Sequence, residues 1–200
     1  MTKKNFEIAK QYARHRLETE LAPYLFYHSF AHTYEQVLPA AIQLAREIGI
    51  SEEEQKLLEV AASYHDIGFV IQSANHELVG AKIAAQTLPG FGFTASQIET
   101  IIGMIMATRL PQSPRNLLEQ IIADADLYVL GSDNFFVTSH NLRLELEARG
   151  EVSTDEEWYQ KQLEFLENHH YFTKAANLLR GPGKKRNIAE IKRRWTFVIS

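Results

Sequence analysis

Residues 57–68 read LLEVAASYHDIG, and this stretch decides the fold. Its apolar residues recur at spacings of three and four, which predicts a helix with one buried face. Ser51 and Glu54 form a capping box upstream, so we expect the helix to begin directly after Ser51. His65 and Asp66 end the apolar run. A buried Asp66 without a partner would cost free energy, so it needs a cation or several hydrogen-bond donors.

The same helical periodicity continues on both sides of this stretch, and the sequence offers no convincing pair of strands. We therefore predict an all-α protein with a single domain over residues 1–200. Besides the helix ending at His65-Asp66, the expected helices cover residues 6–21, 29–49, 75–88, 94–106, 113–130, 133–149, 154–168, 173–180 and 184–197. Pro39 is expected to kink the second helix, and Gly181-Pro182-Gly183 to separate the last two.

The composition limits the classes of function that the chain can have. The chain has 200 residues, 45% apolar and 23% charged, enough for one sizeable core. Its net charge of −4 provides no chain-wide positive field, which argues against nucleic acid as a partner. Because cysteine is absent, any metal must be held by histidine and carboxylate side chains. The sequence shows no signal-peptide pattern and no apolar run of about 18 residues, so we expect a cytoplasmic protein without a membrane partner.

Two further segments place histidine or aspartate next to apolar residues. Residues 123–126 read ADAD within an apolar series, so at least one of the two acids is expected to face inward. Residues 27–33 read YHSFAHT, and His28 and His32, four positions apart, lie on one face of a helix. Zinc proteases use this spacing, but no Glu follows His28, so the metalloprotease pattern fails.

These segments together predict a site for one divalent metal ion. The expected ligands are His32, His65, Asp66 and one of Asp124 and Asp126. Such a set suits manganese, iron, cobalt, nickel, zinc or magnesium without selecting among them. It leaves coordination positions at which a phosphoryl group can be polarised and water activated. Taken alone, each segment has a simpler interpretation. His65-Asp66 would be a charged pair at the end of a helix, and Asp126 would accept hydrogen bonds from the N-terminus of a neighbouring helix.

The order of these residues resembles the H…HD…D signature of the HD-domain metal-dependent phosphohydrolases. His32, then His65-Asp66, then Asp126 fit its order and spacing, and the resemblance spans about residues 27–131. It implies an irregular helical bundle of the HD-domain and phosphodiesterase type, with the metal in a central cleft. Residues 132–200 would then form helices that pack on this core.

The resemblance also implies roles for individual residues. It favours Asp126 over Asp124 as the fourth ligand, and Asp124 is then expected to support the catalytic site from behind the ligands. In the cyclic-nucleotide phosphodiesterases, which share this core, the histidine matching His28 gives a proton to the leaving oxygen. His76 is a second candidate for proton transfer or for a ligand of a second metal. Residues 105–109, however, contain no further histidine, which argues for one metal ion. Related nucleotidases carry a catalytic Glu where this chain has Phe69, so their mechanism does not transfer intact.

An anionic substrate needs positive partners near the metal. The candidates are Arg109, which is favoured, and Arg115, Arg143 and Lys174. The basic residues between 180 and 194 are interpreted as a solvated helical face. The predicted function is metal-dependent hydrolysis of a phosphomonoester or phosphodiester, with a nucleotide or related small molecule as partner. The alternatives are an HD-type oxidase or lyase and a non-catalytic nucleotide-sensing module; a homo-oligomer is compatible with the sequence.

Overall fold

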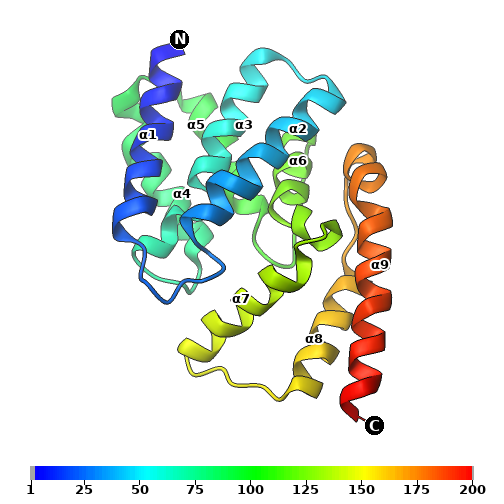
Figure 1. Ribbon diagram of the computed structural model, residues 1–200. Helices are drawn as coiled ribbons and strands as arrows, with labels where there is room; N and C mark the ends of the chain where they lie inside the picture. The colour runs from blue at the N-terminus through cyan, green and yellow to red at the C-terminus, as the bar shows by residue number, and fades with distance from the viewer. Residues whose placement is uncertain (1–2, 200) are drawn as a thin grey trace.

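The computed structural model describes residues 3–199, and these contain helices and turns but no strand (Figure 1). The all-α prediction is confirmed. The α-helices are α1 (Lys3–Glu20), α2 (Leu38–Ile48), α3 (Glu52–Tyr64), α4 (His76–Thr87), α5 (Ala95–Ala107), α6 (Leu117–Asp126), α7 (Phe135–Ala148), α8 (Asp155–Asn168) and α9 (Lys174–Ile199). Four shorter elements connect them, a π-helix η1 (His32–Val37) and the 3-10 helices η2 (Ile67–Val70), η3 (Leu88–Phe91) and η4 (Tyr128–Gly131).

Helix α3 lies at the centre of the main core. It contacts α1, α2, α5 and α6, and its residues Leu58 and Tyr64 are fully buried. The predicted capping box is present, because the Ser51 side chain accepts from the Glu54 backbone N–H and the Glu54 side chain accepts from the Ser51 N–H. The capping box sets the first residue of α3, and burial of the helix along its length carries its C-terminal end into the core. The functional pair His65-Asp66 therefore lies inside the protein.

Helices α7, α8 and α9 lie on one side of the bundle formed by α1 to α6 (Figure 1). Their apolar side chains form a second, smaller cluster with the end of α6, made of Leu127, Leu130, Phe135, Leu163, Leu166 and Ile191. No linker separates the two clusters, because η4 begins two residues after α6 ends. We propose that the whole chain is one domain.

The predicted break at Gly181-Pro182-Gly183 is wrong, because α9 runs without interruption from Lys174 to Ile199. Gly183, together with Gly131 of η4, instead allows close backbone contact between α9 and η4. A Cβ atom added at Gly183 would lie 2.0 Å from the Gly131 carbonyl oxygen, and one added at Gly131 would lie 2.2 Å from the Arg180 carbonyl oxygen. Packing of α9 on η4 and α8 offsets the backbone hydrogen bond that Pro182 removes.

Asp124 anchors the start of α9 rather than the predicted site. Its two carboxylate oxygens accept hydrogen bonds from the backbone N–H groups of Phe172 and Thr173, both at 2.8 Å, and from the Thr173 hydroxyl at 2.6 Å. The Thr173 hydroxyl in turn accepts from the Ala176 N–H in the first turn of α9. Asp124 is fully buried and its oxygens are engaged, so we assign it a structural role.

Asp124→Ala should lower the free energy of unfolding by about 2–4 kcal/mol, because it leaves two buried N–H groups and a hydroxyl without their acceptor. Urea unfolding measures this loss, and the metal content of the folded variant should equal that of the wild type. Loss of bound metal with unchanged stability would show instead that Asp124 supports the metal site.

Candidate metal centre

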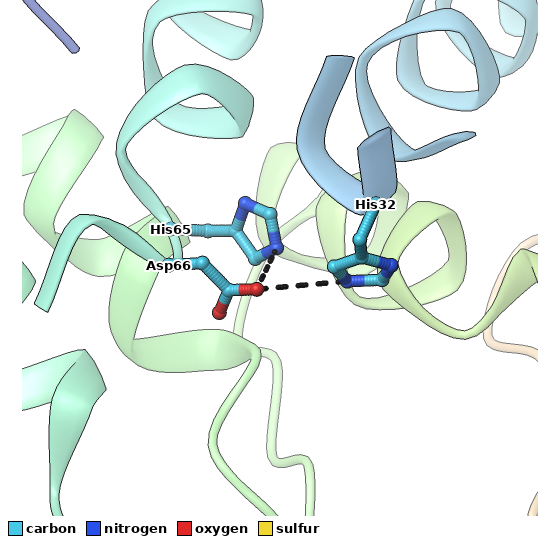
Figure 2. Close-up of side chains that lie close together, drawn as sticks. All are labelled: His32, His65 and Asp66. Atoms are coloured by element: carbon cyan, nitrogen blue, oxygen red, sulfur yellow. Dashed lines mark ion pairs between the residues drawn. The ribbon is translucent and has the colours of Figure 1, made fainter. Parts of the chain in front are cut away.

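Three elements that are distant in sequence bring the predicted ligands together. His65 and Asp66 follow the last turn of α3, His32 begins η1, and Asp126 ends α6. Figure 2 shows His32, His65 and Asp66 pointing toward one another, and one ligand atom from each lies within 4.8 Å of the others. The Asp66 Oδ2 atom lies 3.2 Å from His65 Nε2 and 3.6 Å from His32 Nε2. The Asp126 Oδ1 atom lies 3.2 Å from His32 Nε2 and 3.5 Å from His65 Nε2.

The segment that carries His32 is a π-helix, not the first turn of a kinked α-helix as predicted. The wider π turn spans His32 to Val37, and α2 begins at Leu38. Pro39 consequently lies in the first turn of α2, directly after the π-helix. Instead of the predicted kink at Pro39, the chain changes from a π-helix to an α-helix, and the π-helix places His32 at the site.

The buried atoms of this cluster fit a metal ion. The Nδ1 atom of His65 lies 2.8 Å from the Ala62 carbonyl oxygen, to which it donates, so Nε2 presents a lone pair. His32 Nδ1 lies 3.5 Å from Gln36 Oε1, and its Nε2 faces Asp126 Oδ1 at 3.2 Å. His65 Nε2 and Asp66 Oδ2 are buried without a hydrogen-bond partner among the described residues. A cation between these atoms would satisfy both.

The ionised carboxylates of Asp66 and Asp126 favour a cation between the ligand atoms. Burial alone would raise the pKa of Asp66, yet His65 and His76 lower it well below its usual value. Burial would lower the pKa of His65, but Asp66 and Asp126 raise it well above its usual value. Burial likewise opposes ionisation of Asp126, whereas His32 and His65 lower its pKa to about 2. Two buried carboxylates therefore stay ionised, and a divalent ion that displaces the proton from His65 Nε2 would neutralise them.

His28 and His76 lie beside this cluster, and both imidazoles stack on Phe69. Ring centroids are 4.2 Å apart for His28 and Phe69 and 4.0 Å apart for Phe69 and His76. His76 Nε2 lies 3.4 Å from Asp66 Oδ1, and its Nδ1 lies 3.2 Å from the Ser73 carbonyl oxygen. Phe69, which stands where related nucleotidases carry a Glu, contacts both imidazoles, whose ring centroids are 5.7 Å apart.

Glu145 of α7 is a site residue that the sequence did not reveal. Its side chain is fully buried and lies 2.6 Å from His28 Nδ1, and it accepts from the backbone N–H groups of Tyr27 and His28, both at 3.0 Å. Burial would raise the pKa of Glu145, but its bonds with His28 lower it, so the carboxylate stays ionised. It occurs in the charged run LRLELEAR, which has the pattern of a solvated helix face, and it lies 117 residues from His28.

A cavity of about 570 Å³ opens over these residues. Its floor contains Asp66, Asp126, His28 and His76, and one wall is apolar. Of the predicted phosphate partners only Arg109 lines it, where it donates to Asn75 Oδ1 at 3.1 Å. Lys161 of α8 also lines the cavity, although the sequence did not single it out.

The other predicted cations and Asp124 do not line this cavity. Arg115 is largely exposed and paired with Glu119 at 3.1 Å, which holds it on the surface. Lys174 is exposed at the start of α9. Arg143 is held by Glu147, Asp155 and the Ser153 carbonyl oxygen. The structure does not place these predicted residues at the cavity, because other protein groups bind them or they face solvent.

Comparison with known proteins agrees with this geometry. The family model described as HD domain matches residues 26–129, so the chain belongs to the HD-domain family, a superfamily of metal-dependent phosphohydrolases. This confirms the resemblance seen in the sequence. No curated protein matches the chain.

Two solved structures share the fold. The Bacillus subtilis protein YpgQ, in complex with ADP, is 15% identical over 95% of this chain and 93% of that chain, with a TM-score of 0.67. A Lactobacillus plantarum protein is 20% identical over 98% of both chains, with a TM-score of 0.65. At these identities the likeness concerns the fold alone, and it extends into the C-terminal helices. Within residues 3–199, no helix is both long and apolar enough to span a bilayer.

Manganese should raise the unfolding temperature of the metal-free protein, because an ion that binds only the folded state adds roughly 2.7 kcal/mol at roughly 100 times its dissociation constant. Asp66→Asn should abolish this shift, measured by differential scanning fluorimetry. The matched control is Asp133→Asn, whose side chain is 96% exposed, and it should keep the full shift. An equal shift in all three proteins would place the ion elsewhere.

Proposed function

We propose that this protein is a metal-dependent phosphohydrolase that cleaves the phosphate ester of a nucleotide or a related small molecule. The observation that carries the proposal is the buried group of His32, His65, Asp66 and Asp126, of which Asp66 and Asp126 line the floor of a cavity that also holds His28 and His76. A divalent ion held by His32, His65, Asp66 and Asp126 would polarise the phosphoryl group and favour the ionised form of water.

His28 is the residue that we assign to proton transfer. Its Nδ1 atom is held by the ionised Glu145, so Nε2 is the nitrogen left to carry the exchangeable proton. During hydrolysis a bond forms between the water oxygen and phosphorus, and the bond between phosphorus and the leaving oxygen breaks. The leaving oxygen takes the proton from His28 Nε2, and the proton released by the attacking water restores that nitrogen.

His76 is assigned a binding role instead. Both of its ring nitrogens already face oxygen atoms, Nε2 that of Asp66 and Nδ1 that of Ser73. Burial would lower the pKa of His76, but Asp66 raises it, so a positive His76 fits beside the phosphate. Arg109 and Lys161 add positive charge at the cavity wall. The ADP bound to YpgQ, which has this fold, supports a nucleotide as the substrate.

The test is release of inorganic phosphate and nucleoside from nucleoside monophosphates, diphosphates and cyclic diesters, assayed with manganese, cobalt and magnesium. Turnover should occur with at least one substrate, and a double variant with His65→Ala and Asp66→Ala should lose at least about 100-fold, because the metal supplies several kcal/mol of charge stabilisation. Equal rates in both proteins would reveal a contaminant. A bound metal without any turnover would favour the non-catalytic nucleotide-sensing module, and oxygen consumption with two bound irons the oxidase.

Glu145→Gln should slow hydrolysis of an ester with an alkoxide leaving group by roughly 10- to 100-fold, because a neutral amide no longer favours the protonated ring of His28. The p-nitrophenyl ester needs little protonation of its leaving oxygen, so its hydrolysis should change by less than about threefold. Steady-state kinetics on the two esters measures this contrast. Glu147→Gln on the same helix, which pairs with Arg143 outside the cavity, is the matched control. Equal losses on both esters would rule out proton donation through His28.

A further inference from the structure

The apolar wall of the cavity is built by residues outside the stretch that matches the HD family. Phe135, Leu142 and Leu146 come from α7, and Trp158 and Phe165 come from α8. The family match ends at residue 129. We call the part of the cavity between these side chains the α7–α8 chamber. It adjoins the catalytic floor, so a substrate whose phosphate lies at the metal ligands would extend into it.

The chamber selects against strongly polar groups. A sugar or an amino acid placed there would lose its hydrogen bonds to water and find few replacements among leucine, phenylalanine and tryptophan side chains, which costs free energy. A flat aromatic ring would lose little and could stack against Trp158 or Phe165. The whole cavity of about 570 Å³, floor included, falls in the size range of small-ligand sites.

One polar pair in the chamber distinguishes an aromatic heterocycle from a plain hydrocarbon. Ser139 of α7 is 8% exposed, and its hydroxyl donates to Gln162 Oε1 of α8 at 3.0 Å. Both residues line the cavity. The bond holds the Gln162 amide in place, and among residues 5–196 no protein group accepts a hydrogen bond from its Nε2. Because the Gln162 amide is fixed, its Nε2 can donate a hydrogen bond to a ligand in the apolar chamber. This favours an aromatic ring that carries a hydrogen-bond acceptor on its edge.

We infer that the α7–α8 chamber binds the base of a nucleotide, with Gln162 Nε2 donating to a ring nitrogen or carbonyl oxygen of that base. The inference rests on the proposed function for the position of the phosphate. Ser139 fixes the amide, and Trp158 and Phe165 contact the ring. Specificity for a nucleotide over other phosphate esters then comes from α7 and α8, whereas the catalytic floor comes mainly from residues within the HD match.

Trp158 provides a direct binding signal. The chain has two tryptophans, so Trp195→Phe leaves Trp158 as the only one. Adenosine, guanosine and uridine 5′-monophosphates should quench its fluorescence after chelation of the metal has stopped turnover. Each should bind at least about 10-fold more tightly than ribose 5-phosphate, which lacks the base, because stacking and one hydrogen bond are then lost.

Gln162→Leu in this background should weaken binding of the nucleotides about 3- to 10-fold and leave ribose 5-phosphate unchanged. Gln162→Glu keeps the size of the side chain and the acceptor for Ser139 but removes the donor, so it should weaken nucleotide binding as well. Gln160→Leu, at an exposed position of the same helix, is the matched control and should bind like the parent. Unfolding temperatures show that each variant is folded.

The inference is overturned if ribose 5-phosphate or an alkyl phosphate binds as tightly as the nucleotides, or if both Gln162 variants bind like the parent. Failure of the proposed function gives a different result. Nucleotides would then quench Trp158 fluorescence and depend on Gln162, yet the metal-loaded enzyme would hydrolyse none of them. Hydrolysis of ribose 5-phosphate as efficient as that of adenosine monophosphate would support the phosphohydrolase and contradict the chamber.

Discussion

Two ionised carboxylates, Asp66 and Asp126, face the Nε2 atoms of His32 and His65 inside the protein, and they need a cation between them. The surrounding elements bring these side chains together. Helix α3 is buried on several sides and ends at the pair His65-Asp66, and the π-helix η1 turns His32 toward that end. A cluster with two buried negative charges would be costly without metal, so a bound ion supplies folding free energy as well as chemistry.

The C-terminal helices complete a site that the matched HD stretch begins. Glu145 of α7 fixes the ring of His28 through its Nδ1 atom and holds the backbone of Tyr27 and His28. Asp124 holds the start of α9, and Gly183 of α9 allows close contact with Gly131 of η4, directly beyond α6. The same elements carry the apolar wall of the cavity. Proton transfer and recognition of the substrate are therefore both assigned to contacts between the two halves of the chain.

The sequence predicted the parts of this arrangement that depend on local pattern. Periodicity, with capping residues for α3 and α5, predicted these helices and α8, and the H…HD…D order predicted four candidate ligands that the structure brings together. It did not predict Glu145, because a carboxylate in a charged helix has the same local pattern whether it faces solvent or a histidine 117 residues away. The hydrogen bonds of Asp124 could not be predicted either, since its partners at residues 172–173 are distant in sequence. Pro182 was read as a helix end because the packing of α9 on η4 cannot be seen locally.

The position of the metal is the central claim, and anomalous diffraction from crystals grown with manganese tests it most directly. We predict one strong anomalous peak within bonding distance of His32 Nε2, His65 Nε2 and the carboxylates of Asp66 and Asp126, on the floor of the cavity. A peak bound by other residues, or no peak at this position in protein that binds manganese in solution, would contradict it.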